Sequence, residues 1–193
     1  DDAHEEQQVV VAGHHVLGAE IHQRPDRLPV ETLKEDGVLT RHAVRAEPDV
    51  ISPNVLEAEE LVGHEFNDDE DRVIAVREMV ELGAREAIMT MPDGCFAMMV
   101  PDEPNGDPCL YRVQVPAGAI EPRATVGSGD AFLAGFVAAR YTGSPAEECL
   151  RFGVACGAES TQHLGAGLVD LERVQRLLDE IEVQRPELPA EVG

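Results

Sequence analysis

The chain has 193 residues, enough for one domain with a sizeable hydrophobic core or for one large lobe of a bigger protein. Hydrophobic residues make up 43% of it, which argues against an intrinsically disordered chain. Lysine and arginine number 15 against 38 aspartates and glutamates, so the formal net charge is −23. A field of this sign repels nucleic acid and anionic membranes, and both are poor candidates for partners.

No apolar run approaches the length of a membrane span, and the acidic start "DDAHEEQQ" does not resemble a signal peptide. We therefore expect a cytoplasmic protein that does not bind membranes. The acidic surface favours solubility, with adaptation to salt as one reason for it, and an acidic binding surface is the alternative.

The first half of the chain shows strand and helix patterns in turn. "VVVAG" at 9–13 predicts a short buried strand, 14–36 has no regular pattern, and "GVLTRHAVRA" at 37–46 predicts a short helix. A strand with Val50 and Ile51 follows and ends at a Pro-Asn turn. The next expected elements are helices at 55–62 and about 68–82, the second with Val73, Val76 and Val80 on one face and a Gly83 cap.

The second half begins with strands and ends with helices. "AIMTM" and "CFAMMV" flank a "PDG" turn and predict a strand pair, and "LYRVQV" at 110–115 predicts a further strand. A helix is expected at 130–141. A second should run from a capping box of Ser144, Pro145 and Glu147 to about 161. The third, at 171–182, should have four apolar side chains facing inward: Leu171, Val174, Leu178 and Ile181. The alternation predicts an α/β layered fold with a mainly parallel sheet flanked by helices.

The stretch "TVGSGD" at 125–130 lies between a strand region and a helix. Gly127 and Gly129 allow unusual dihedral angles, so successive amides can converge on an anion at the positive end of the helix. Asp130 could then accept a proton from a hydroxyl that attacks phosphorus. An ordinary glycine-rich turn with Asp130 as a helix cap explains these six residues equally well.

Three further patterns are weaker. Asn54 and Glu57 are three residues apart, a spacing typical of a capping box, although an amide and a carboxylate on one turn could also position Mg²⁺. The turn in "TMPDGC" at 90–95 could lie against a nucleotide, but most such turns only reverse the chain. No CxxC or HExxH spacing occurs, so we expect reduced cysteines and no structural zinc site, and the pair His14 and His15 is left unassigned.

Together these segments resemble the ribokinase-like (PfkB) family of carbohydrate kinases. "PDVISPNVLEAEELVG", "TVGSGDAFLAGF" and "GVACGAESTQHLGAGL" are similar, in this order and spacing, to three separated motifs of that family. The greatest similarity is to the branch of 1-phosphofructokinases and tagatose-6-phosphate kinases, and it covers about residues 37–182. The resemblance implies a nucleotide-binding catalytic part at 37–183 after an unassigned segment at 1–36, with a flexible tail at 184–193. By the same resemblance, we expect the family's N-terminal half and β-sheet lid to be missing from this chain.

The resemblance also implies a role for each matching residue. Asp130 would activate the sugar hydroxyl, and Gly127, Ser128 and Gly129 would form the anion hole for the transferred phosphoryl group. Magnesium would be held with the help of Asn54 and Glu57. ATP would lie against Thr90, Gly94 and Gly129, with its adenine bordered by the helix near Cys156 and Gly157.

These roles imply transfer of a phosphoryl group from ATP, with Mg²⁺, to a sugar phosphate such as fructose 1-phosphate. A truncated remnant that binds nucleotide or a protein partner without catalysis is the main alternative, and an α/β interaction domain without either activity is a third. Family members often pair through the lid, so a homodimer is one candidate assembly.

Overall fold

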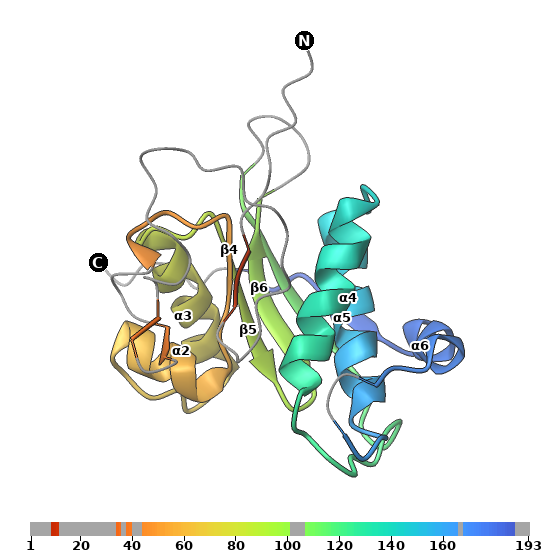
Figure 1. The fold of residues 1–193 in the computed structure, drawn as a ribbon. Coiled ribbons are helices and arrows are strands. Elements are labelled where there is room, and N and C mark those ends of the chain that lie inside the picture. The colour runs from red at the N-terminus through yellow and green to blue at the C-terminus, as the bar shows by residue number, and fades with distance from the viewer. Residues whose placement is uncertain are drawn as a thin grey trace.

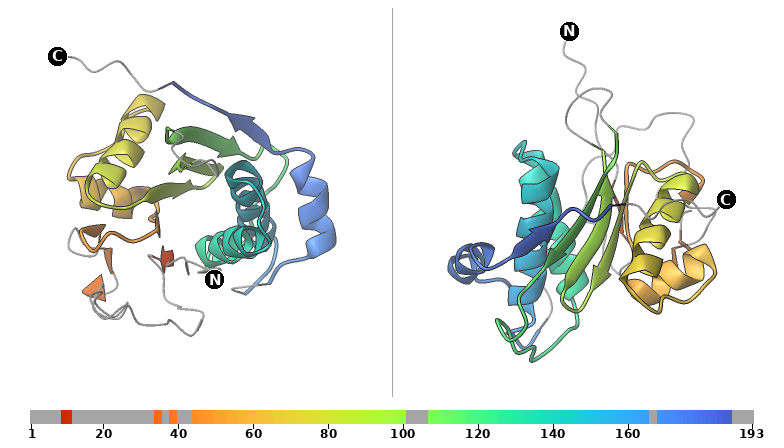
Figure 2. Two further views of the ribbon diagram at one scale, coloured as in Figure 1. Left: turned by 90° about the horizontal axis from the view of Figure 1, so that it is seen from above. Right: turned by 180° about the vertical axis from the view of Figure 1, so that it is seen from behind.

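The computed structural model describes residues 44–100, 107–165 and 168–187, together with the backbone of three short strands before residue 40. Most of the irregular segment at 14–36, including His14 and His15, lies outside the described residues. One sheet forms the centre of the molecule, with α2 (Val55–Val62) and α3 (Asp69–Glu81) on one face (Figure 1). The other face carries α4 (Ser128–Tyr141) and α5 (Ala146–Ser160), and α6 (Leu171–Leu178) packs outside α5 (Figure 2).

The sheet has six strands in the order β1 (Val9–Val11), β4 (Val50–Ser52), β5 (Glu86–Met91), β6 (Gly94–Met99), β7 (Cys109–Gln114) and β8 (Glu182–Gln184). The α/β layered arrangement is confirmed. The sheet itself is mixed, which corrects the expectation of a mainly parallel one: β1, β4 and β5 run parallel, whereas β5, β6, β7 and β8 pair antiparallel. The two-residue turn between β5 and β6 permits no other pairing, because a parallel connection needs a crossover.

Successive side chains along the strands point to opposite faces of the sheet, and this alternation divides the core into two layers. In β5, Ala87 and Met89 face α2 and α3, while Ile88 between them faces α4 and α5. The same alternation occurs in β6, where Phe96 belongs to the first layer and Cys95 to the second. Both faces of these strands are therefore buried, which explains why they are apolar at nearly every position.

Local sequence signals located two helices accurately. The helix expected at 55–62 has these bounds, with Asn54 as its N-cap, and α3 differs by one residue at each end from the expected 68–82. Gly83 follows the C-cap of α3 with a φ of +131°, as the cap prediction requires. Among the described residues, no helix is long and apolar enough to cross a membrane.

Two predictions differ from the structure: one concerns the helix expected at 37–46, and the other concerns the start of α5. Within the helix expected at 37–46, Val38 and Leu39 instead form a short strand, β3 (Val38–Leu39), paired with β2 (Lys34–Glu35). Residues 40–43 lie outside the described residues, and Val44 is helical. The predicted capping box of α5 is absent, because Pro145 is the N-cap and no side chain caps the helix. The carbonyl of Ser144 instead accepts a hydrogen bond from the thiol of Cys149, 3.2 Å away.

The C-terminal helix is shorter than expected. Helix α6 ends at Leu178, Leu171 is 63% exposed, and the buried Ile181 lies beyond the helix. Val174 is buried as expected, and Leu177 provides the other buried contact of α6. The chain then forms the edge strand β8, which no local pattern predicted and which includes Gln184, the first residue of the expected tail. This strand pairs with β7, so its position depends on residues about 70 positions earlier.

The turn between β5 and β6 brings Gly94 unusually close to the neighbouring strand. Gly94 has a φ of +149°, and a Cβ atom there would lie 2.0 Å from the carbonyl oxygen of Val113 in β7. Hydrogen bonding continues on the same side, since the amide of Val115 donates to the carbonyl of Asp93 at 2.8 Å. A side chain at position 94 would therefore push β6 and β7 apart.

We expect Gly94→Ala to lower the free energy of unfolding by about 2–3 kcal/mol, because it adds a backbone clash to a strained φ. The measurement is urea denaturation followed by circular dichroism. Gly118→Ala is the matched control, because Gly118 also has a positive φ (+85°) but no atom within 4 Å of the added carbon. Equal losses in the two variants would show that the clash with β7 contributes nothing.

Candidate active site at the start of α4

Helix α4 runs antiparallel to β5, and one buried ion pair marks this alignment. Arg140, near the end of α4, donates to the carboxylate of Glu86, the first residue of β5, at 2.9 Å. Glu86 is 1% exposed, and this burial raises the pKa of its carboxyl group, although the Arg140 guanidinium acts in the opposite direction. Because the end of α4 meets the beginning of β5, the first turn of α4 lies toward the carboxyl ends of the parallel strands (Figure 1).

The segment from Thr125 to Gly129 forms a turn that opens directly into α4. Gly127 is the N-cap with a φ of +85°, and no side chain caps the helix. The carbonyl of Thr125 accepts from both the amide and the hydroxyl of Ser128, at 3.2 and 2.9 Å. Among the described residues, the amides of Gly127, Gly129 and Asp130 have no acceptor. The start of α4 therefore offers three open N–H groups at the positive end of its dipole.

Asp130 lies in the first turn of α4, beside these open amides. Its side chain is half-buried, and its carboxylate has no hydrogen bond or ion pair within the described ranges. The alternative of an ordinary helix cap does not describe it, because the N-cap is Gly127 and Asp130 follows three residues later. A carboxylate that is neither capping nor paired is available to take up a proton.

The ends of β4 and β5 form the second part of the site. The amide of Thr90 donates to the carbonyl of Pro53 at 2.9 Å, and its hydroxyl points to the same carbonyl at 3.3 Å. A parallel bridge joins Asn54 to Thr90, so the starts of the two connections that follow these strands are adjacent. Such carboxyl ends of parallel strands are where α/β sheets bind ligands.

Asn54 and Glu57 form the capping box of α2, as one of the two interpretations predicted. The Asn54 carbonyl oxygen accepts from the amide of Glu57 at 3.0 Å, and the Glu57 carboxylate accepts from the amide of Asn54 at 2.9 Å. The box holds both side chains on the first turn of α2 at the end of β4. A capping role and a place beside a bound ion are compatible at this position.

Three hydrogen bonds attach the approach to the α4 turn to the end of α5. The amides of Arg123 and Ala124 donate to the carbonyl of Thr161, at 2.9 and 3.0 Å. The side-chain amide of Gln162 donates to the carbonyl of Glu121, also at 2.9 Å. Sequence reasoning missed this attachment, because no local pattern relates residues 121–124 to residues forty positions later.

Cys156 and Gly157 lie where α5 crosses α4. A Cβ atom at Gly157 would lie 3.1 Å from the carbonyl oxygen of Ser128 and from the Cβ of Phe132. Cys156 is 4% exposed, and its thiol faces Gly135 of α4. Both residues therefore contact the first turns of α4. If this part of α5 borders the adenine, as predicted, the contact would have to come from the backbone of these residues or from their neighbours.

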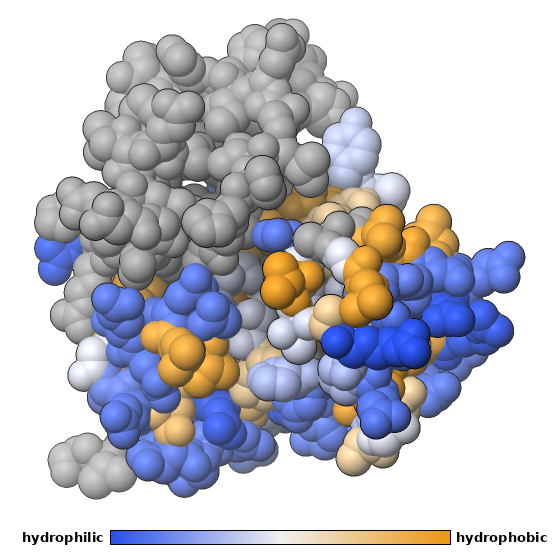
Figure 3. Space-filling model, turned by 60° about the horizontal axis from the view of Figure 1, so that its bottom comes forward, coloured by the Kyte–Doolittle hydropathy of each residue, from blue (hydrophilic) through white to orange (hydrophobic). Residues whose placement is uncertain are grey.

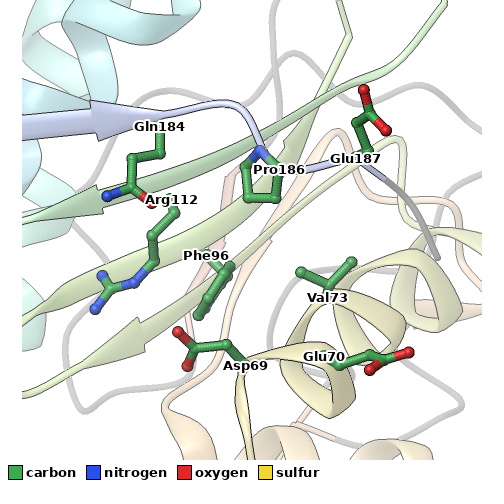
Figure 4. A pocket seen from close by; sticks show the side chains of 8 residues that line it. All are labelled: Asp69, Glu70, Val73, Phe96, Arg112, Gln184, Pro186 and Glu187. Atoms are coloured by element: carbon green, nitrogen blue, oxygen red, sulfur yellow. The ribbon is translucent and has the colours of Figure 1, made fainter.

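A pocket of about 420 Å³ lies on the opposite side of the sheet (Figure 4). Phe96 and Arg112 line it from the strands, and Asp69, Glu70 and Val73 line it from α3. The Arg112 guanidinium is held by Asp93 at 2.6 Å and lies 5.0 Å from the centre of the Phe96 ring. None of the predicted site residues lines this pocket, so it is separate from the site at the start of α4.

Comparison with known proteins identifies the lineage of this site. The sequence profile of the pfkB family of carbohydrate kinases matches residues 30–173. The chain belongs to this family. It is 31% identical over 145 residues to 1-phosphofructokinase of Borreliella burgdorferi and 32% identical over 145 residues to that of Bacillus subtilis. These matches cover 75% and 74% of this chain but 44% of each relative, so the chain spans less than half the length of these proteins.

Solved structures of the family show the same fold. Ribokinase of Arabidopsis thaliana, complexed with ribose and ATP, is 26% identical with a TM-score of 0.60, over 75% of this chain and 45% of that one. Phosphofructokinase-2 of Escherichia coli, in complex with substrates and products, is 25% identical with a TM-score of 0.59, over 72% and 44% of the two chains. The ribokinase-like fold expected from the motifs is thereby confirmed.

The capping role of Asn54 predicts a measurable effect on stability. Asn54→Ala removes the acceptor for the Glu57 amide, so we expect the free energy of unfolding to fall by about 1 kcal/mol. Asn54→Asp keeps an acceptor in place and should change it much less. Chemical denaturation of the three proteins checks this, and equal stabilities for Ala and Asp would contradict the cap.

The burial of Cys156 predicts low thiol reactivity. Desolvation raises the pKa of Cys156 to about 11 and that of Cys95 to about 12, so both remain protonated at pH 8. We expect iodoacetamide to modify Cys109, the half-buried cysteine, well before Cys95, Cys149 or Cys156 in the folded chain. Mass spectrometry of tryptic peptides checks the order, with labelling in urea as control. Early modification of Cys156 would contradict its place against α4.

Proposed function

We propose that this chain supplies the nucleotide-binding and catalytic part of a kinase that transfers the γ-phosphoryl group of ATP to a hydroxyl of a sugar phosphate. The observation that carries this proposal is the first turn of α4. Its open amides and the unpaired carboxylate of Asp130 lie toward the ends of β4 and β5. The likeness to two 1-phosphofructokinases favours fructose 1-phosphate as the acceptor and fructose 1,6-bisphosphate as the product.

Each part of this arrangement matches a need of phosphoryl transfer. The transferred group carries negative charge on three oxygens, which the amides of Gly127, Gly129 and Asp130 can stabilise. The Asp130 carboxylate would accept the proton of the attacking hydroxyl as the new bond to phosphorus forms. Ser128 would contribute through the shape of the turn, because its own amide and hydroxyl both donate to Thr125.

The residues at the end of β4 fit a magnesium ion that is shared with ATP. Within the described residues, no group of three or more histidines, cysteines, aspartates or glutamates is placed to hold a metal. Magnesium needs no such cage in kinases, where one or two protein oxygens, water and substrate phosphates complete its shell. Glu57 and Asn54 provide oxygens of this kind, and a bound ion would offset the charge of the phosphates.

Apolar side chains near the α4 turn provide a surface for the base and ribose of ATP. Val126 is 80% exposed in the turn itself, and Leu164 and Leu168, after α5, are 84% and 55% exposed. The hydrogen bonds from Arg123 and Ala124 to Thr161 keep the two segments adjacent. In Figure 3, where the lower side of Figure 1 comes forward, apolar groups are exposed among hydrophilic ones. Large apolar side chains exposed at one place commonly mark a binding site.

A part that binds nucleotide or a protein partner without catalysis is the second candidate. The chain spans 44% of the 1-phosphofructokinases it matches, so residues outside it could be required for the sugar site. Where the second candidate binds nucleotide, the two agree on ATP binding and differ in turnover. A cytoplasmic location and assembly as a homodimer belong to the same proposal, and both follow from the soluble kinase lineage rather than from a contact in the structure.

Turnover and ATP binding in the Asp130→Asn variant separate these candidates. We expect the variant to bind ATP normally and to lose about 10²–10⁴-fold in turnover, because the amide cannot accept the proton. A coupled assay of ADP release with fructose 1-phosphate, fructose 6-phosphate and tagatose 6-phosphate measures this. Asp179→Asn, an equal change of charge at the exposed C-cap of α6, is the control.

The outcomes of this experiment differ clearly. Turnover that survives Asp130→Asn would remove Asp130 from the role of base. ATP binding by the unmodified chain without turnover on any of the three sugars would favour the non-catalytic candidate. A chain that neither binds ATP nor releases ADP would contradict the proposed function as a whole.

A further inference from the structure

A buried carboxylate near the end of α5 has no role in the function proposed above. Glu159 is 1% exposed and lies in the last turn of α5. This position is unfavourable for a carboxylate on two grounds, since burial removes its hydration and the end of a helix carries partial negative charge. A buried charge of this kind persists only where its partners compensate for the lost water.

The partners of Glu159 come from the connection between α5 and α6. Its carboxylate accepts from the backbone amide of Asp170 at 2.9 Å and contacts the His163 ring nitrogen Nε2 at 2.8 Å. The guanidinium of Arg173 lies 4.0 Å away. Asp170 is itself the N-cap of α6, where its side chain accepts from the amides of Glu172 and Arg173. One side chain therefore fixes both ends of the connection that leads from α5 to α6.

The same turn of α5 holds the approach to the α4 turn. Thr161, two residues after Glu159, accepts from the amides of Arg123 and Ala124 through its carbonyl. Gln162 donates to the carbonyl of Glu121. Disturbing the end of α5 would thus disturb residues 121–124, which lead directly into the turn with the open amides of Gly127, Gly129 and Asp130. Leu164, which is 84% exposed, follows His163 directly in the chain.

We propose that Glu159 is the positioning residue of the nucleotide site. It holds the end of α5 and the start of α6 together, so that the α4 turn and the apolar residues after α5 keep their mutual positions before ATP binds. At 1% exposure it acts through His163 and the Asp170 amide rather than by touching the nucleotide. The inference rests on the proposed function, because it assigns to Glu159 the arrangement of that same site.

Hydrogen–deuterium exchange of the ATP-free chain tests the positioning directly. We expect Glu159→Ala to speed exchange by about fivefold or more in peptides that cover 121–130 and 163–170, because local opening becomes easier. Glu159→Gln keeps an acceptor for the Asp170 amide and should restore most of the protection. Glu86→Ala is the matched control, because it removes another ion-paired carboxylate that is 1% exposed. Glu86 is the first residue of β5, and the candidate site lies toward the other end of this strand.

Titration calorimetry with ATP and Mg²⁺ gives the functional readout. We expect Glu159→Ala to weaken ATP binding by about tenfold, whereas Glu86→Ala, although destabilised, should bind within about twofold of the unmodified chain. Faster exchange confined to 163–170, or equal weakening of binding by both variants, would overturn the inference. If the unmodified chain binds no ATP, the proposed function fails on that result alone, and the exchange at 121–130 still decides whether Glu159 positions the α4 turn.

Discussion

The close contact between α4 and α5 is the constraint on which the site depends. Glycines allow the approach: a Cβ atom at Gly135 would lie 2.8 Å from the Cys156 sulfur, and one at Gly153 would lie 3.0 Å from the carbonyl oxygen of Phe132. Gly157 makes the same kind of contact with the first turn of α4. Helices that approach so closely behave as one rigid unit, because a packed interior leaves no room for small adjustments. The end of α5 and the beginning of α4 are therefore placed together.

Electrostatics adds a second constraint, since the proposed function requires a chain of net charge −23 to bind polyphosphate. In the structure, the ion pair that α4 makes and its open amides lie at opposite ends of the helix. Glu86 and Arg140 form their ion pair at the end of α4 that lies away from the site, while the open amides are at its start. Backbone N–H groups attract an anion over a short range and do not depend on the overall charge. The acidic surface can therefore serve solubility and remain compatible with the proposed binding of ATP at the α4 turn.

Much of the fold was predictable because its signals are local. The capping pair of Asn54 and Glu57 defines the start of α2, and the "PDG" turn joins two apolar runs into β5 and β6. The α4 turn was recognisable for the same reason, with Gly127 adopting the positive φ that its sequence suggested. Some expectations failed although the partner is near in sequence, since Val38 and Leu39 form a strand by pairing with β2, three to five residues earlier. Leu171 remains exposed although Val174 and Leu177 of the same helix are buried. The strand β8 was not predicted because its partner β7 lies about 70 positions earlier.

The amino-acid sequence alone indicated the family, the order of the elements from β4 to α6 and Asp130 as the candidate base, because motifs and short-range spacing carry that information. Only the tertiary structure decided that β8 pairs with β7, that the Cys156 thiol faces α4, and that Glu159 is buried against His163 and the Asp170 amide. These features depend on which surfaces meet after folding. The sequence pattern of a helix does not show whether a glutamate such as Glu159 faces solvent or a partner eleven residues away. Only the packing of α5 against its neighbours distinguishes these two environments.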